Sequence, residues 1–220
     1  MIITIDGPAG AGKSSAARRL AQRLGFEFLD TGAMYRAVAL AALRAGINLR
    51  EEAALARLVA GLRLEMPSGG QVFLDGEEVT AQIRTREVTS ATSAVADSPA
   101  VRRRLAQMQR HIAQDRNMVC EGRDQGTLVF PDAACKFFLF ADPFERARRR
   151  QREMEARGER VELEQLLREQ ESRDQRDAAR DLAPMKPAAD AVLLDSTHLD
   201  LEQVVEAMIA EVRRRGLGSS

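Results

Sequence analysis

Residues 2–15 read IITIDGPAGAGKSS, and this stretch decides the fold. An apolar run at residues 2–5 is followed by the pattern G-x-x-x-x-G-K-[ST] at residues 7–14, and then by apolar residues at helical spacing. A strand, a glycine-rich loop and a helix in this order form the context in which the pattern binds phosphate. A glycine-rich turn without a ligand would have to match strand, spacing, lysine and serine by coincidence. We therefore interpret the stretch as a nucleoside triphosphate site.

Each part of this phosphate loop (residues 7–14) has its own chemical task. The glycines let successive backbone N–H groups point toward phosphate oxygens, and the dipole of the following helix adds to them. Lys13 has the length to reach the β- and γ-phosphates, and the Ser14 hydroxyl is the expected ligand of Mg²⁺. We predict that ATP, with Mg²⁺, is bound by Gly7, Pro8, Ala9, Gly10, Ala11, Gly12, Lys13, Ser14 and Ser15.

Four further short apolar runs lie at residues 26–29, 118–120, 137–140 and 191–194, and helical patterns separate them. Strands that alternate with helices predict a parallel sheet, so we expect an α/β fold of the P-loop type with three layers and a five-stranded parallel sheet. The first helix should end at Gly25, which suits a left-handed C-terminal residue. The last helix should begin near Asp200, because Gln203 completes a capping box.

Two stretches depart from this alternation of strands and helices. Residues 62–79 alternate apolar and polar side chains around a turn at residues 67–70 and a second turn at Asp75-Gly76, so they predict a small inserted antiparallel β meander. Residues 142–181 hold 11 Arg against 12 Asp plus Glu and few large apolar side chains. We expect this segment to be a helical, solvated and mobile lid without a core.

These features predict one domain with three regions. The core takes about residues 1–30, 85–141 and 182–220, the monophosphate-binding region with its β insertion takes about residues 31–84, and the lid takes about residues 142–181.

Composition excludes several classes of protein. The 220 residues are 45% hydrophobic and 30% charged, which argues against a disordered chain, and no apolar run approaches the ~20 residues that span a bilayer. Because 33 basic residues balance 33 acidic ones, we expect no nucleic-acid partner. The first residues lack the pattern of a secretory signal, so we expect a cytoplasmic protein. Cys120 and Cys135 have no metal-binding spacing and should be buried.

A phosphate loop alone does not separate a kinase from a GTPase or a motor ATPase. The chain lacks the Asn/Thr-Lys-x-Asp motif that reads guanine, which weighs against a GTPase. Arg36 and Arg123 each follow a predicted strand, so they should lie near the sheet edge where the loop opens. The planar fork of arginine matches phosphate, so these two residues indicate a second, phosphorylated substrate.

Several motifs together resemble one family. They are the loop ITIDGPAGAGKS at residues 3–14, LDTGAMYR at residues 29–36, IRT at residues 83–85, EGRD at residues 121–124 with Gly126-Thr127, VFPDA at residues 129–133 and DST at residues 195–197. This combination resembles the bacterial cytidylate kinases over essentially the whole chain. The resemblance implies phosphoryl transfer from ATP to CMP or dCMP with Mg²⁺, by an enzyme of nucleotide metabolism that acts as a monomer.

The resemblance also implies roles for individual residues. The CMP phosphate would be bound by Arg36 and Arg123, the cytosine by Thr31, Arg102, Asp124 and Arg180, and the ribose by Ser93, Arg173 and Asp177. These roles suit the chemistry, since a carboxylate accepts from the cytosine amine and arginine donates to its ring acceptors. The spacing of Arg173, Asp177 and Arg180 predicts one shared helical face.

In nucleoside monophosphate kinases, some lid arginines close over the transferring phosphoryl group. We assign this role to Arg146 and Arg149, one helical turn apart, so the expected catalytic residues are Lys13, Arg123, Arg146 and Arg149. His111 and His198 have no partner pattern and are expected at the surface or at a helix cap. The chain departs from the family at Gln125, where an apolar residue is usual, and at Met185 and Lys186.

Two other functions fit the residues. A related kinase could act on UMP, dTMP or a non-nucleotide acid, because only the acceptor site would differ. A P-loop regulatory ATPase or an RNA-binding switch would hydrolyse ATP slowly and signal by its shape. Phosphorylation of a panel of acceptors separates these functions.

Overall fold

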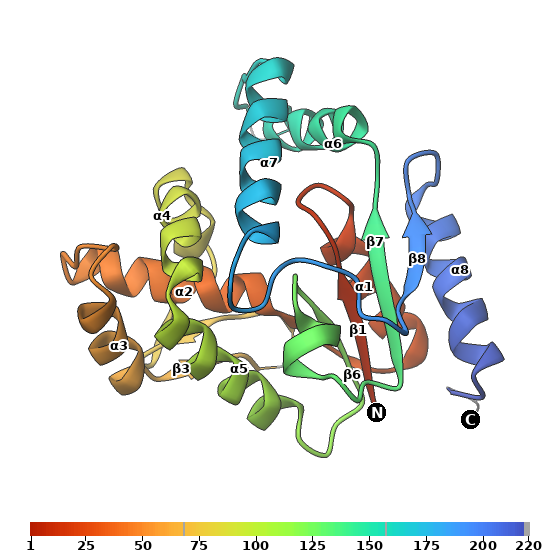
Figure 1. The fold of residues 1–220 in the computed structure, drawn as a ribbon, viewed down its shortest axis with the longest axis horizontal. Coiled ribbons are helices and arrows are strands. Elements are labelled where there is room, and N and C mark those ends of the chain that lie inside the picture. The colour runs from red at the N-terminus through yellow and green to blue at the C-terminus, as the bar shows by residue number, and fades with distance from the viewer. Residues whose placement is uncertain (68, 157, 218–220) are drawn as a thin grey trace. The chain divides into compact units, whose positions relative to one another are not determined.

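The computed structural model describes residues 1–67, 69–156 and 158–217. Figure 1 shows the order of its elements. The strands are β1 (Ile2–Asp6), β2 (Glu27–Asp30), β3 (Leu64–Glu65), β4 (Phe73–Leu74), β5 (Glu77–Glu78), β6 (Met118–Glu121), β7 (Cys135–Phe140) and β8 (Val192–Asp195). The α-helices are α1 (Lys13–Leu24), α2 (Thr31–Arg44), α3 (Glu52–Gly61), α4 (Arg86–Asp97), α5 (Pro99–Ala113), α6 (Pro143–Glu155), α7 (Leu163–Ala178) and α8 (Leu201–Arg214). A 3₁₀ turn, η1 (Gln82–Arg84), and a π-helical turn, η2 (Gln125–Val129), complete the set.

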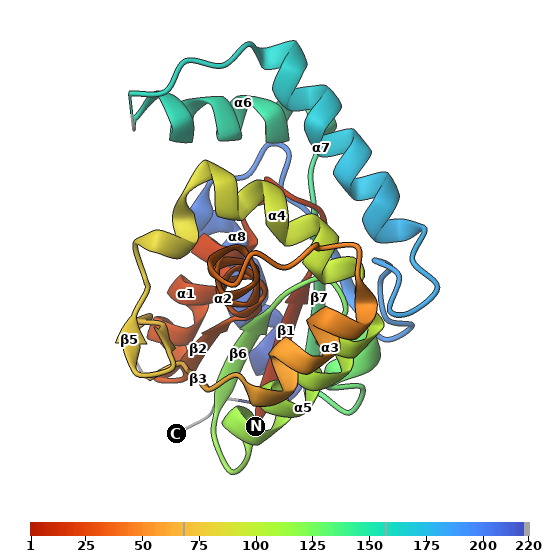
Figure 2. The ribbon, with the colours of Figure 1, turned by 90° about the vertical axis from the view of Figure 1, so that its left-hand side faces the viewer.

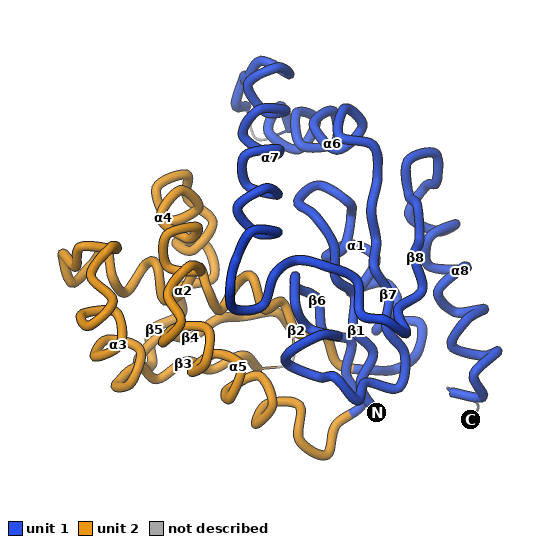
Figure 3. The backbone as a smooth tube through the Cα atoms, viewed as in Figure 1, with its two compact units in different colours: residues 1–26, 117–220 blue, residues 27–116 orange. Residues whose placement is uncertain are grey.

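The chain divides into two compact units, coloured separately in Figure 3. Unit 1 comprises residues 1–26 and 117–220, and unit 2 comprises residues 27–116. Unit 1 carries the phosphate loop and both lid helices, whereas unit 2 carries the β meander.

The five strands predicted from the short apolar runs form one sheet in the order β2-β6-β1-β7-β8. β1 pairs in parallel with β6 and with β7, and β7 pairs in parallel with β8. Ile3, Thr4 and Ile5 are all buried, so both faces of β1 are covered, as in a parallel sheet with layers on either side. The predicted α/β fold with a five-stranded parallel sheet is confirmed.

The two predicted caps of unit 1 are also confirmed. Gly25 takes a left-handed conformation at the end of α1, and its N–H bonds back to carbonyls of that helix. Asp200 and Gln203 form the reciprocal capping box at the start of α8. Ala16 and Leu20 of α1, and Val205 and Met208 of α8, are buried, which follows from the apolar stripe of each helix.

The β meander of unit 2 is antiparallel, as its sequence predicts. β4 pairs with β3 and with β5, and Leu64 lies opposite Leu74. Asp75 and Gly76 both have positive φ angles, 51° and 86°, which is the backbone of a tight hairpin turn. Of the first predicted turn, Ser68 lies outside the described residues. Helices α4 and α5 of unit 2 begin at side-chain caps, since Thr85 caps α4, and Ser98 caps α5 with Pro99 in its first turn.

The lid segment is helical, but the expectation that it has no core is wrong. Helices α6 and α7 cross and are in contact (Figure 2), and they enclose a small cluster of Ala147, Met154 and Leu166, against which Val161, Leu163 and Leu167 pack. Few apolar residues suffice here because the two helices and the segment between them bring these residues into one cluster. Charged side chains of the segment such as Arg152, Glu153 and Glu164 are exposed.

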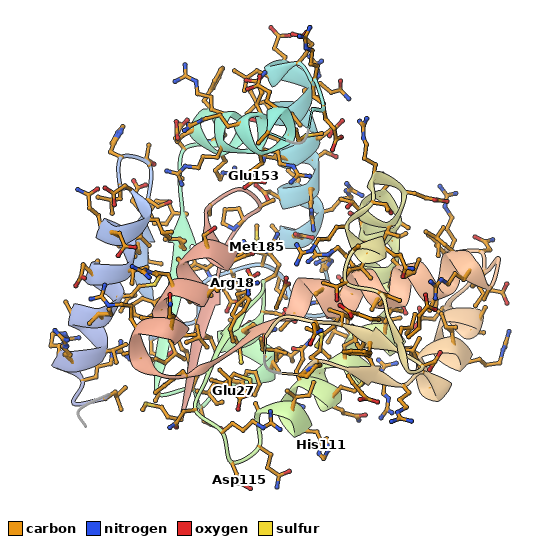
Figure 4. All side chains as sticks on the ribbon, turned by 180° about the vertical axis from the view of Figure 1, so that it is seen from behind. Arg18, Glu27, His111, Asp115, Glu153 and Met185 are labelled. Atoms are coloured by element: carbon orange, nitrogen blue, oxygen red, sulfur yellow. The ribbon has the colours of Figure 1, made fainter. Side chains whose placement is uncertain are left out.

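The other residues singled out by sequence lie as expected. Cys120 and Cys135 are buried with free thiols. His198 is exposed, and His111 projects from the exposed side of α5 (Figure 4). No helix within the described residues is long and apolar enough to cross a bilayer.

Candidate active site

The phosphate loop joins β1 to α1 through three glycines with positive φ angles: 140° at Gly7, 76° at Gly10 and 87° at Gly12. Any side chain at Gly7 would meet the carbonyl oxygen of Leu139, since a Cβ there would lie 1.9 Å from it. Gly12 is the N-cap of α1, so the backbone N–H groups at the start of this helix lie at the loop. The loop therefore has the backbone form that anion binding requires.

Lys13 is folded into its own loop. Its side chain is buried, and Nζ donates to the carbonyl oxygen of Pro8 at 2.7 Å. Burial, together with the nearby charge of Arg123, lowers the pKa of the Lys13 ammonium to about 7. A bound polyphosphate would supply the opposite charge that this ammonium needs.

Ser14 and Glu121 form the part of the site that suits a metal ion. The Ser14 hydroxyl donates to Oε1 of Glu121, the last residue of β6. The described residues contain no group of three or more metal-binding side chains. Mg²⁺ typically uses one or two protein oxygens together with substrate phosphates, so a hydroxyl beside a carboxylate fits this ion.

Asp6 connects the phosphate loop to the loop that follows β6. Its two carboxylate oxygens accept the backbone N–H groups of Gln125 at 2.9 Å and Gly126 at 2.8 Å. Burial raises the pKa of Asp6 to about 7. These bonds fix the start of η2, directly after Arg123 and Asp124. The Gln125 side chain is buried there, so this polar departure from the family is accommodated inside the fold.

Several residues that the resemblance assigns to CMP meet in unit 1. Asp177 lies between two arginines, with Oδ2 3.2 Å from Nε of Arg123 and Oδ1 2.6 Å from Nη2 of Arg180. Asp124 is buried on the same loop as Arg123. The prediction that Arg173, Asp177 and Arg180 share one helical face is wrong for Arg180. Helix α7 ends at Ala178, so Arg180 reaches Asp177 from beyond the helix end.

Arg173 lies on α7 in unit 1, and four assigned CMP residues lie in unit 2: Thr31, Arg36, Ser93 and Arg102. Thr31 is the buried first residue of α2, Ser93 is half-buried on α4, and Arg102 is buried on α5. Arg102 donates to the carbonyl oxygen of Ala96 at 3.0 Å, and its guanidinium lies 5.9 Å from the ring centre of Tyr35. The stacked, hydrogen-bonded guanidinium is thereby held in one orientation.

Arg36 is held by Asp30, a residue that sequence reasoning quoted in a motif but did not assign. Asp30 caps α2 by accepting from the N–H of Ala33, and its Oδ2 lies 3.2 Å from Nη2 of Arg36. Arg84 approaches the same oxygen at 3.9 Å. One carboxylate thus caps a helix and orients Arg36, a combination that a lone Asp before a helix does not reveal in sequence.

The two lid arginines assigned to the phosphoryl group, Arg146 and Arg149, both have partners within the protein. Arg146 is buried, pairs with Asp174 and donates from Nη1 to the carbonyl oxygen of Ala9 at 2.9 Å. Arg149 donates to the carbonyl oxygen of Ser196 at 2.6 Å and pairs with Glu145. The number of charges in the segment could not predict these pairs, because it does not show which acidic residue faces which basic residue.

Sequence reasoning missed four carboxylates that organise the site: Asp6, Asp30, Glu121 and Asp174. Each acts through an arginine, a serine or a backbone N–H that sequence had marked. The available signal was position, since Asp6, Asp30 and Glu121 are the last residues of β1, β2 and β6. In parallel α/β sheets, binding sites form at the carboxyl ends of the strands.

Comparison with known proteins agrees with this geometry. A family model described as cytidylate kinase matches residues 3–214. The chain belongs to the cytidylate kinase family. It is 50% identical to the cytidylate kinase of Pelotomaculum thermopropionicum, with 96% of this chain and 95% of that protein covered. It is 48% identical to that of Citrifermentans bemidjiense, with 98% and 94% covered.

Solved structures share the fold at low sequence identity. An uncharacterised protein from Eubacterium ventriosum superimposes with a TM-score of 0.53 at 13% identity, covering 97% of this chain and 98% of that chain. Shikimate kinase from Bacteroides thetaiotaomicron gives a TM-score of 0.50 at 13% identity, with 99% of each chain covered. These two structures support the P-loop kinase fold alone.

Proposed function

We propose that this protein of the cytidylate kinase family transfers the γ-phosphoryl group of ATP to CMP or dCMP, with Mg²⁺, and yields ADP and CDP or dCDP. The observation that carries the proposal is the joint placement in unit 1 of a phosphate loop with Lys13 and an arginine-rich acceptor cluster. The cluster consists of Arg123, Asp177 and Arg180. An enzyme that only hydrolyses ATP has no need of this acceptor cluster.

The donor half rests on the phosphate loop. Its backbone N–H groups would bind the phosphates of ATP, and the Lys13 ammonium would neutralise charge between the β- and γ-phosphates. Ser14 and Glu121 would hold Mg²⁺, which when bound shields the negative charge of the phosphates. Arg146 and Arg149 are held at the loop by Ala9 and Ser196, so they are the candidates to contact the phosphoryl group in transfer.

The acceptor half rests on paired arginines. Arg36 and Arg123 would bind the CMP phosphate, and each is already oriented by a carboxylate, Asp30 or Asp177. Phosphoryl transfer asks little covalent chemistry of the protein, so positioning and charge stabilisation supply most of the rate enhancement. The proposal requires no protein nucleophile. The enzyme would act as a monomer on small-molecule substrates.

The test is a coupled assay of ADP release with CMP, dCMP, UMP and AMP as acceptors. CMP and dCMP should raise ADP release far above the rate without acceptor, and Lys13→Ala should lower kcat on the order of 10²-fold or more with the fold intact. Preference for another monophosphate would favour a related kinase. A rate that no acceptor raises would favour a regulatory ATPase.

A further inference from the structure

The Asp174 carboxylate is positioned against the phosphate loop. One of its oxygens, Oδ1, accepts the backbone N–H of Ala9 at 3.3 Å, and the other, Oδ2, pairs with Nη1 of Arg146. The side chains of Asp174 and Arg146 are only 15% and 6% exposed. A carboxylate of α7 therefore occupies an N–H group of the loop itself.

The same carboxylate acts on Lys13. Asp174 is among the negative charges that raise the pKa of this ammonium, against the larger lowering by burial. Asp174 thus interacts with a loop N–H, a lid guanidinium and the loop lysine. These are the three kinds of group that bind a nucleotide phosphate.

Helices α6 and α7 approach the phosphate loop closely at Gly10. A Cβ at Gly10 would lie 2.9 Å from Nε2 of Gln170 and 3.0 Å from Cβ of Arg146, so only glycine lets α6 and α7 approach the loop this far. Gln170, one turn before Asp174 on α7, donates from Nε2 to the carbonyl oxygen of Arg146 at 3.4 Å. Backbone shape and hydrogen bonds both hold Asp174 at the loop.

We propose that the Asp174 carboxylate competes with nucleotide phosphate for the phosphate loop: its contacts with the Ala9 N–H and with Arg146 must break when a nucleotide phosphate binds. The inference rests on the proposed function, because it takes the nucleotide as the competing ligand. Displacement frees the Arg146 guanidinium to bind phosphate in place of the carboxylate. The lid contact thereby lowers the apparent affinity for the donor, since binding requires the minor state in which Asp174 has left.

Removal of the negative charge of Asp174 should therefore tighten the binding of phosphate ligands to the loop. Asp174→Asn keeps an oxygen that can accept from the Ala9 N–H but no longer pairs ionically with Arg146. We expect the Kd for ADP, for a non-hydrolysable ATP analogue and for inorganic tripolyphosphate to fall about threefold to tenfold by calorimetry. The three ratios should agree, because the competition concerns phosphate and not the base.

The matched control is Glu171→Gln, which removes an exposed carboxylate from the same helix and should leave all three Kd values unchanged. A merely structural role for Asp174 predicts weaker binding on substitution, because damage to the lid cannot improve the loop. Unchanged or weaker binding of the three probes by Asp174→Asn would overturn the inference. A wild-type protein that bound none of the probes would instead contradict the proposed function.

Discussion

Nε of Arg123 lies 3.2 Å from Oδ2 of Asp177, so the proposed ligand of the CMP phosphate pairs with a proposed ligand of the ribose. Arg180 holds the other oxygen of the same carboxylate. Asp177 therefore fixes the guanidinium of Arg123 before a substrate arrives, and the arginine needs little rearrangement to bind a phosphate.

From this relationship we expect Arg123→Gln to lower kcat/KM for CMP about 10²-fold, because charge-assisted hydrogen bonds to the acceptor phosphate are lost. The KM for ATP should change less than about threefold, since the phosphate loop keeps its own ligands. Steady-state kinetics with each substrate varied in turn measures both values. Arg103→Gln, at an exposed position of α5, is the control, and wild-type kcat/KM for CMP in Arg123→Gln would contradict the assignment.

The lowered pKa of Lys13, about 7, predicts a pH dependence of donor binding. As the pH rises through 7, the free enzyme loses the ammonium charge and its affinity for ATP should fall. Bound ATP raises the pKa of Lys13 again, because its phosphates favour the charged form. We therefore expect kcat/KM for ATP to decline above pH 7 while kcat stays level to a higher pH.

A binding measurement separates Lys13 from other titrating groups. In Lys13→Arg the side chain keeps its charge at every pH of interest, so the Kd for ADP should no longer rise between about pH 7 and pH 9. If the Kd of this variant rose as steeply as that of the wild type, another group would control the pH dependence. Asp6, whose pKa is raised to about 7, would then be the next residue to test.

Glu121 should set the requirement for Mg²⁺, because its carboxylate contacts the Ser14 hydroxyl. In Glu121→Gln we expect the Mg²⁺ concentration at half-maximal velocity to rise about tenfold. In calorimetry the gain in ADP affinity on adding Mg²⁺ should shrink, whereas ADP binding in EDTA should be unchanged. Glu206→Gln, on the exposed face of α8, serves as the control. An unaltered Mg²⁺ response in Glu121→Gln would assign this carboxylate a purely structural role.

The parts of the fold that sequence predicted are those with local signals. Residues 2–15 specify strand, loop and helix within one stretch, and Asp200 with Gln203 specifies a cap over four residues. The contacts of Asp174 join residues 28 and 165 positions apart, and no local pattern encodes them. The π-helical turn η2 was missed for a similar reason, since Asp6 holds its first N–H groups from 119 residues away.

The cluster in the lid predicts how α6 and α7 are held together. Leu166 is 4% exposed and packs with Ala147 and Met154, so Leu166→Ala should cost about 2 kcal/mol of local stability. Limited proteolysis should then cut the lid faster than in the wild type, while Leu193→Ala, at an exposed position of β8, should not change the rate. A non-hydrolysable ATP analogue with CMP should protect both variants. Equal cleavage of the lid with and without these ligands would contradict its closure over bound nucleotides.

Asp124 should determine which nucleotide base the acceptor site prefers. Cytosine presents an amine at C4 where uracil presents a carbonyl oxygen, so a buried carboxylate attracts the first and repels the second. The backbone carbonyl of Asp124 accepts the N–H of Leu128 at 2.9 Å, and this bond survives replacement of the side chain. In Asp124→Ala the amine loses its partner, at about 1–3 kcal/mol, and the repulsion of O4 disappears. We expect kcat/KM for CMP to fall while that for UMP falls less or rises, with little change in the KM for ATP.

The variant Asp124→Asn sharpens the test, because an amide can accept from cytosine and donate to uracil. The ratio of kcat/KM for CMP to that for UMP should therefore narrow without the cavity that alanine would leave. Asp132→Asn, at an exposed position between η2 and β7, controls for loss of charge. An equal loss with both acceptors in Asp124→Ala would show that the carboxylate organises phosphate or Mg²⁺ and does not read the base.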